Sequence, residues 1–219
     1  TLFLAFSKAA LAQFGNCTAS EMRTYVDSAT GNTITMLTDT MKNDRFLYQT
    51  DPMWTADGKY LLFRSSSRGN DKEVESTLPN GEKRKWTPTQ IYFIEMATGK
   101  IIQATEGPNL GSAFLANKTN RMFVSRKEKE NWNMYVMDLD KFFADVKQGK
   151  VGKPSAYETF IGTFPTEMGR PGGYAVDCND DYAYITVERE GTEEEKERMM
   201  KNAFLPESNQ PVKIKPTLC

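Results

Sequence analysis

Hydrophobic and polar residues alternate over short stretches of the chain, and turn residues separate these stretches. One series contains, in order, a short run around Trp54, a turn at 57–59, and apolar runs at 60–63, 90–95 and 101–105. Alternation with a period of two residues is typical of β-strands that bury one face. Four strands joined in sequence are the content of one propeller blade. The pattern therefore predicts an all-β fold.

The same unit recurs along the chain. The apolar run at 60–63 corresponds to 121–124, which lies 61 positions later, and then to 182–185 after another 61 positions. The run at 91–94 also has a counterpart, at 134–137. A fixed period that carries one supersecondary unit indicates a repeat architecture. The repeat therefore favours a β-propeller, with the strands led by Trp54, Phe114 and Tyr174 innermost.

Residues 13–219 hold about three and a half four-stranded blades, whereas a closed propeller needs roughly four to eight. We therefore expect an incomplete propeller, with blade repeats near 21–50, 51–110, 111–170 and 171–219. Two polar insertions lengthen the period, at 70–86 and at 191–210. The second contains a capping box at Thr192 and Glu195, which predicts a helix that packs in a loop or covers the mouth of the propeller.

The first twelve residues form a separate segment. Their apolar run ends in Ala10-Leu11-Ala12, which has the small-x-small shape of a signal-peptidase site. The run is too short to span a membrane. We interpret residues 1–12 as the remnant of a signal peptide and expect a periplasmic or secreted protein; the alternative is a short buried helix.

Composition excludes several kinds of chemistry. The chain contains no histidine, so it offers no imidazole base, no histidine triad and no histidine metal site. Its three cysteines, Cys17, Cys178 and Cys219, lie too far apart for a zinc or redox motif. The net charge of −1 gives no indication of nucleic-acid binding. The basic run at 83–85 is interpreted as a solvated loop. We predict no catalytic residue and no metal ligand in this chain.

Several stretches occur in the order found in one known family. They are residues 24–31, 36–38, 45–49 and 57–63, continued by 103–107 and 112–114. This series resembles the N-terminal portion of oligogalacturonate lyases, which degrade pectin fragments; only 146–170 matches poorly. The resemblance implies a seven-bladed propeller, β-elimination on short galacturonate oligomers, and a divalent metal such as manganese in the full-length protein. The family's base and most of its metal ligands are histidines, so none is carried over, and we expect this portion alone to be inactive.

Candidate substrate contacts lie at the end of the propeller where ligands usually bind. Arg45, Tyr48 and Gln49 precede an innermost strand, Arg68 begins a loop between second and third strands, and Arg170 precedes another innermost strand. A guanidinium group binds a carboxylate through two parallel hydrogen bonds, which suits an acidic oligosaccharide. For each arginine the alternative is a salt bridge between blades or a solvated loop.

Tryptophans could also contact a sugar ring. Trp86 ends the first insertion and is the candidate for stacking, whereas Trp54 and Trp132 are expected to pack in the interior.

Three functional classes stay open at this point. The first is an exported oligogalacturonate lyase of which this is the N-terminal half. The second is a TolB-like propeller that binds proteins or sugars without chemistry. The third is the propeller of a peptidase, whose hydrolase domain would carry a Gly-x-Ser-x-Gly elbow; the 219 residues contain no such elbow.

Overall fold

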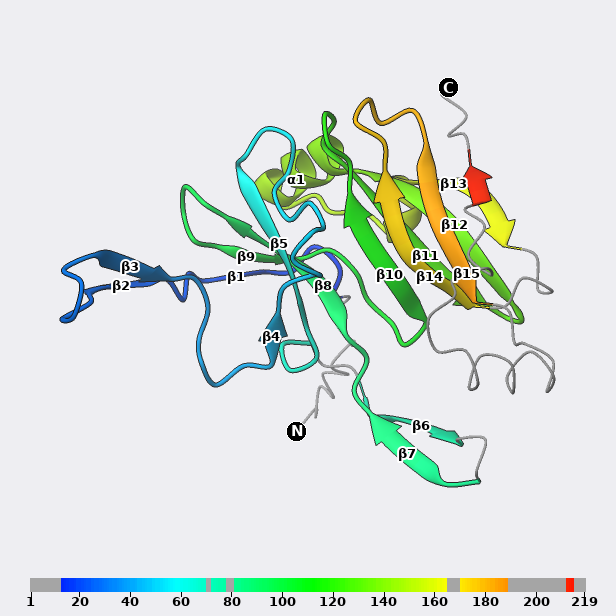
Figure 1. Ribbon diagram of the computed structural model, residues 1–219, viewed down its shortest axis with the longest axis horizontal. Helices are drawn as coiled ribbons and strands as arrows, with labels where there is room; N and C mark the ends of the chain where they lie inside the picture. The colour runs from blue at the N-terminus through cyan, green and yellow to red at the C-terminus, as the bar shows by residue number, and fades with distance from the viewer. Residues whose placement is uncertain (1–12, 70–71, 78–80, 165–169, 189–211, 215–219) are drawn as a thin grey trace, which may run out of the picture.

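The computed structural model describes residues 13–69, 72–77, 81–164, 170–188 and 212–214. The predicted helix at 191–210 and the segment 1–12 lie outside the described residues. Within the described part, strands dominate and form separate antiparallel sheets (Figure 1). The all-β prediction is confirmed.

Three sheets make up the body of the molecule. The first has five strands in the order β1 (Cys17–Thr18), β9 (Ile101–Gln103), β8 (Gln90–Glu95), β5 (Tyr60–Ser65) and β4 (Asp44–Arg45). The second is β10 (Leu110–Leu115), β11 (Arg121–Glu128), β12 (Asn131–Asp138) and β13 (Glu158–Phe164), and the third is β14 (Arg170–Val176), β15 (Ala183–Glu188) and β16 (Val212–Ile214). Two hairpins, β2 (Arg23–Val26) with β3 (Thr33–Met36) and β6 (Val74–Thr77) with β7 (Lys83–Trp86), project from this body (Figure 1).

The repeated runs occupy equivalent strands. The run at 60–63 lies in β5, 121–124 in β11 and 183–185 in β15. Counted from the edges formed by β4, β10 and β14, each of these is the second strand of its sheet. Trp54 makes a β-bridge to Leu61, while Phe114 and Tyr174 lie on β10 and β14, the edge strands of their sheets. The three sheets hold five, four and three described strands. The sequence predicted four strands in each complete blade, and in the described part only the second sheet has that number.

The fifth strand of the first sheet comes from the start of the described chain. β1 pairs with β9, and the backbone N–H groups of Gln13 and Phe14 donate to the Glu106 carboxylate at 3.0 and 3.1 Å. The Phe14 ring is buried, with its centroid 5.0 Å from that of Phe142. Residues 13–18 thus cover the outer edge of the sheet, which would otherwise expose unpaired backbone groups.

A helix between β12 and β13 was not predicted. In α1 (Leu139–Gln148) the Asp138 side chain accepts the backbone N–H of Lys141 at 3.0 Å, and Gly149 ends the helix at a φ of 65°. Leu139, Phe142 and Phe143 are buried on one face, at the spacing of a helix. Phe143 stacks on Tyr60 of β5, so α1 fills the space between the first and second sheets. Among the described residues, no helix has the length and apolarity needed to cross a membrane.

Neighbouring sheets are also joined through the turns between their first and second strands. The Asp180 carboxylate accepts the backbone N–H groups of Asn117, Lys118 and Thr119 at 2.7–2.8 Å. In the adjacent pair of turns, Asn120 Oδ1 accepts the backbone N–H of Asp57 at 3.2 Å. These contacts fasten one end of the three sheets and leave the opposite strand ends free to form a site.

The packing of α1 can be measured through Phe142, which is fully buried. We expect Phe142→Ala to lower the free energy of unfolding by about 3–5 kcal/mol, because it removes a large ring and leaves a cavity. The matched control is Phe46→Ala, since that ring is 52% exposed and its loss should change stability by about 0.5 kcal/mol or less. Urea unfolding of both variants checks this, and equal effects would contradict the assigned core.

Candidate functional site

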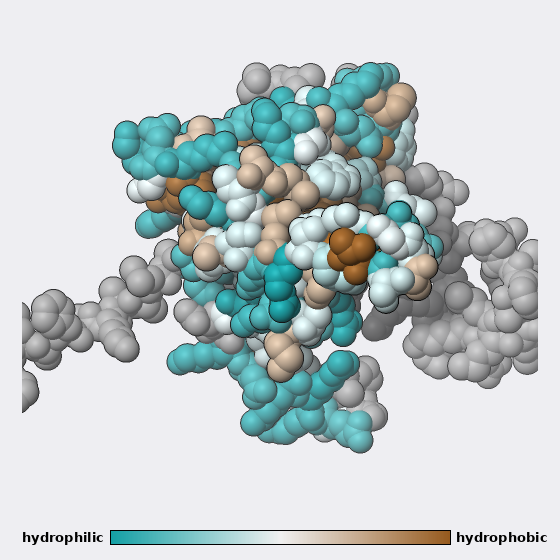
Figure 2. Space-filling model, turned by 90° about the vertical axis from the view of Figure 1, so that its left-hand side faces the viewer, coloured by the Kyte–Doolittle hydropathy of each residue, from teal (hydrophilic) through white to brown (hydrophobic). Residues whose placement is uncertain are grey.

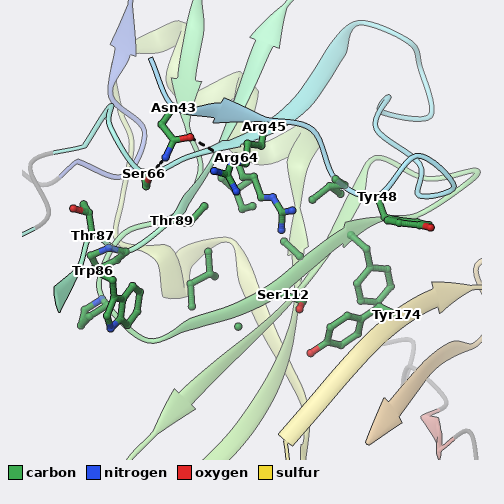
Figure 3. Close-up of a pocket in the computed structure, with 18 of the residues that line it drawn as sticks. Asn43, Arg45, Tyr48, Arg64, Ser66, Trp86, Thr87, Thr89, Ser112 and Tyr174 are labelled. Carbon is green, nitrogen blue, oxygen red and sulfur yellow. Dashed lines mark hydrogen bonds between the residues drawn. The ribbon is translucent and has the colours of Figure 1, made fainter. Parts of the chain in front are cut away.

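A cavity of about 950 Å³ opens at the strand ends opposite the joined turns (Figure 3). It lies where β4 and β5 end, where β8 and β10 begin, and where β7 returns to the first sheet. Its lining includes three arginines, several hydroxyl side chains and aromatic rings, namely Arg45, Arg64, Arg84, Ser66, Ser76, Thr87, Thr89, Ser112, Tyr48, Trp86, Phe114 and Tyr174. We refer to this cavity as the arginine cleft.

The charge of the arginine cleft is mainly positive. Against its three guanidinium groups, Asp51 is the one acidic side chain in the lining. Among the described residues, no carboxylate lies within ion-pair distance of Arg45 or Arg64. The arrangement suits an anionic ligand.

Two of these arginines face each other across a strand pair. Arg45 of β4 is the Cα partner of Arg64 of β5, and both line the cleft. Like charges directly opposite in an antiparallel pair destabilise the sheet. A bound carboxylate between them would convert this repulsion into two charge-assisted interactions. The pair therefore favours anion binding over a purely structural role.

Hydrogen bonds orient Arg45 toward the cleft. Its Nε donates to Asn43 Oδ1 at 3.3 Å, and Asn43 Nδ2 donates to Ser66 Oγ at 2.7 Å (Figure 3). Preorganised donors bind an anion without first losing side-chain freedom.

Aromatic rings form other parts of the wall. Trp86 and Tyr48 remain 37% and 66% exposed, so each presents ring surface to a ligand. Phe114 and Tyr174 stack with centroids 4.9 Å apart, and the Tyr174 hydroxyl lies 2.7 Å from Ser125 Oγ. Sugar rings present apolar C–H faces as well as hydroxyl groups, so stacking platforms beside guanidinium groups suit a charged sugar.

The predicted contact residues do not all come together. Arg45 and Tyr48 line the arginine cleft, whereas Gln49 is exposed beside it and Arg68 lies elsewhere. The backbone of Arg170 opens β14, but its side chain lies outside the described part of the structure.

Arg68 forms a structural ion pair, which was the alternative to substrate binding considered for each arginine. Its Nη2 lies 2.6 Å from both Glu21 Oε2 and Asp44 Oδ2, and its side chain is only 6% exposed. Neighbouring residues on a strand point to opposite sides, so Asp44 turns toward Arg68 while Arg45 turns toward the cleft. Arg68 therefore positions β4 and does not itself line the cleft.

Sequence reasoning missed two cleft arginines. Arg64 is the one exposed residue in the buried strand β5, and that break in an apolar run was a usable signal. Arg84 belongs to the basic run interpreted as a solvated loop. The run is exposed, as that interpretation expects, but 83–86 form strand β7 instead of a loop, and Arg84 lines the cleft. Of the tryptophans, Trp86 lines the cleft, and Trp132 is partly buried against a core cluster that includes Phe114 and Phe123. Trp54 is 47% exposed, so the prediction that it packs in the interior was wrong.

Comparison with known proteins bears on the fold. No family model matches the sequence, and no curated protein matches it. Among solved structures, an oligogalacturonate lyase in complex with manganese superimposes with a TM-score of 0.55 at 19% identity, covering 81% of this chain and 39% of that protein. An oligogalacturonate lyase from Vibrio parahaemolyticus gives a TM-score of 0.55 at 20% identity, covering 84% of this chain and 41% of that protein.

These values show a shared fold with oligogalacturonate lyases, so the predicted resemblance is confirmed at that level. The chain spans about two fifths of the length of the structures it matches. One of them binds manganese, but the described residues here contain no group of three or more His, Cys, Asp or Glu side chains that could hold a metal ion. The described residues thus do not fit a manganese site.

The Arg68 ion pair predicts a pH dependence of stability. Hydrogen bonding to Arg68 lowers the pKa of Glu21 from 4.5 to about 2. A lowered folded-state pKa gives stability that is fully present above pH 4.5 and is lost as the pH falls toward 2. We expect Glu21→Gln to cost about 1–3 kcal/mol at pH 7 and to flatten the stability profile between these pH values.

Urea unfolding at several pH values measures this difference. Glu75→Gln is the control, because Glu75 pairs with the exposed Lys83 and such pairs contribute little. A Glu21→Gln profile parallel to that of the unsubstituted protein would show that the ion pair does not stabilise the fold.

Proposed function

We propose that this chain is the N-terminal part of a β-propeller that binds acidic oligosaccharides and, in the complete protein, cleaves them by β-elimination as an oligogalacturonate lyase does. The observation that carries the proposal is the facing pair Arg45 and Arg64 in the arginine cleft. The fold shared with oligogalacturonate lyases supports the choice of a uronate as the anion.

The arrangement of the sheets supports a propeller. Equivalent second strands recur in three successive sheets, and the edge strands β10 and β14 face each other through Phe114 and Tyr174. This is the relation expected of innermost strands in adjacent blades. A chain covering about two fifths of its structural neighbours matches about three blades of seven.

The chemistry of elimination assigns a role to the arginines. Removal of the proton next to a uronate carboxylate places negative charge on that carboxylate, and guanidinium groups stabilise such charge. Arg45 and Arg64 would hold the carboxylate and orient the ring. The proton needs a positioned base, and because the chain contains no histidine we propose that the base lies outside these 219 residues.

We also propose that the protein is exported. The proposal depends on the apolar run and the Ala10-Leu11-Ala12 site in the sequence. Processing after Ala12 would leave Gln13 at the new terminus, at the start of the described segment in which β1 pairs with β9.

Binding experiments test the role of the arginine pair. We expect Arg45→Ala and Arg64→Ala each to weaken binding of a galacturonate trimer about tenfold or more, because each loses a charge-assisted contact. Their melting temperatures should be unchanged or higher, since the like-charge pair is relieved. Titration calorimetry at two salt concentrations measures the affinity, which should fall with salt.

Arg23→Ala is the charge-matched control for this test, because Arg23 lies on the exposed strand β2, away from the cleft lining. Unchanged affinity with a lower melting temperature for Arg45→Ala would show that the arginine is a structural support. Binding of a protein or a neutral sugar in place of uronates would favour the TolB-like module.

An activity assay separates binding from chemistry. We expect the 219-residue chain by itself to bind the trimer but to produce no unsaturated product, with or without added manganese, because it supplies no histidine base. The ultraviolet absorbance of the unsaturated uronate is the readout. Turnover by this chain would place the base among its own residues and contradict the assignment.

A further inference from the structure

The β6–β7 hairpin has two chemically different faces. Its register pairs Val74 with Trp86 and Ser76 with Arg84, so Ser76, Arg84 and Trp86 share one face, and all three line the arginine cleft. The opposite face carries Glu75, Lys83 and Lys85. On that face Lys83 Nζ pairs with Glu75 Oε1 at 2.8 Å.

Packing does not explain the residues on the cleft face. Every residue of the two strands β6 and β7 except Val74 is exposed, and a two-stranded hairpin is only marginally stable without a core. Figure 2 shows mainly hydrophilic side chains at the lower end of the molecule, where Figure 1 places this hairpin. A tryptophan that remains 37% exposed beside a cleft, next to an arginine, has the composition of a binding surface.

The hairpin and the arginine pair supply separate contacts to one cavity. Figure 3 shows Trp86 on one side of the arginine cleft, away from Arg45 and Arg64, with Tyr48 on the other side. The cavity of about 950 Å³ is near the upper end of the usual range of about 300–1,000 Å³ for ligand sites, so it holds more than one sugar ring. A uronate oligomer carries one carboxylate on each ring, and a second cationic side chain beside the second ring would stabilise its carboxylate.

We propose that the β6–β7 hairpin is a length-selecting arm that binds a second uronate residue of the ligand. Trp86 stacks on the second sugar ring and Arg84 pairs with its carboxylate, while Arg45 and Arg64 hold the first. The inference rests on the proposed function and adds to it the element and the two side chains that recognise the second ring.

The test compares ligand lengths. Titration calorimetry of the protein with galacturonate monomer, dimer and trimer should show tighter binding of the oligomers than of the monomer. Arg84→Ala and Trp86→Ala should each weaken trimer binding about tenfold and leave monomer binding within about twofold. Trp86→Phe should retain most of the trimer affinity, because it keeps an aromatic platform. The tryptophan fluorescence change on trimer binding should be lost in Trp86→Phe.

Lys85→Ala is the matched control, since it removes the same charge from the opposite face of the same strand and should leave trimer affinity within about twofold. Equal melting temperatures for all variants establish that the fold is intact. If Arg84→Ala and Trp86→Ala bind the trimer as the unsubstituted protein does, while Arg45→Ala weakens every length, the arm is refuted and the proposed function stands. Equal weakening of monomer and trimer by Arg84→Ala would also refute length selection. Absence of uronate binding at any length refutes both proposals.

Discussion

The central strands of the first sheet are buried on both faces, and the packing of the neighbouring sheets follows from this burial. β5 and β8 are almost entirely buried, and their side chains join one core cluster with residues of β10, β11 and α1. A second cluster joins β10, β11 and β12 to β15 of the third sheet. Each sheet therefore needs its neighbour to cover a face, and this is the reason that the sheets pack side by side while their ends remain open for a site.

The ion pair of Arg68 fixes strand β4 at the edge of the arginine cleft. β4 has only two residues, Asp44 and Arg45, and a strand that short has little stability of its own. The Arg68 guanidinium binds Asp44 on one side of the strand and Glu21 on the chain segment before it. Arg45, on the other side of the strand, is thereby held opposite Arg64 in spite of their like charge. A buried cation thus fixes the position of an exposed one.

The sequence predicted the parts of the fold that repeat. The apolar runs of β5, β11 and β15 are long enough and similar enough to be recognised without a structure. Helix α1 was missed although Leu139, Phe142, Phe143 and Val146 have helical spacing, because the strand pattern on either side dominated the interpretation. The pairing of β1 with β9 could not have been foreseen, since it joins residues far apart in the chain through backbone groups alone.

The site was harder to predict than the fold. Arg45 and Arg68 have the same chemistry and similar positions beside loops, and only their surroundings in space separate a cleft residue from a buried ion pair. Side chains alternate between the two faces of a strand, so Arg84 lies on one face of β7 and Lys83 and Lys85 lie on the other. This difference could not be predicted while the run was taken to be a loop. Composition pointed to guanidinium groups as the candidate ligands of a carboxylate, and the structure shows which of them line one cleft.

The facing arginines are proposed to form a carboxylate site. A crystal structure of the protein with a bound galacturonate oligomer would test this. We expect one uronate carboxylate at about 2.7–2.9 Å from the guanidinium nitrogens of both Arg45 and Arg64. An oligomer bound away from these two side chains, or one that contacts the cleft only through its hydroxyl groups, would contradict it.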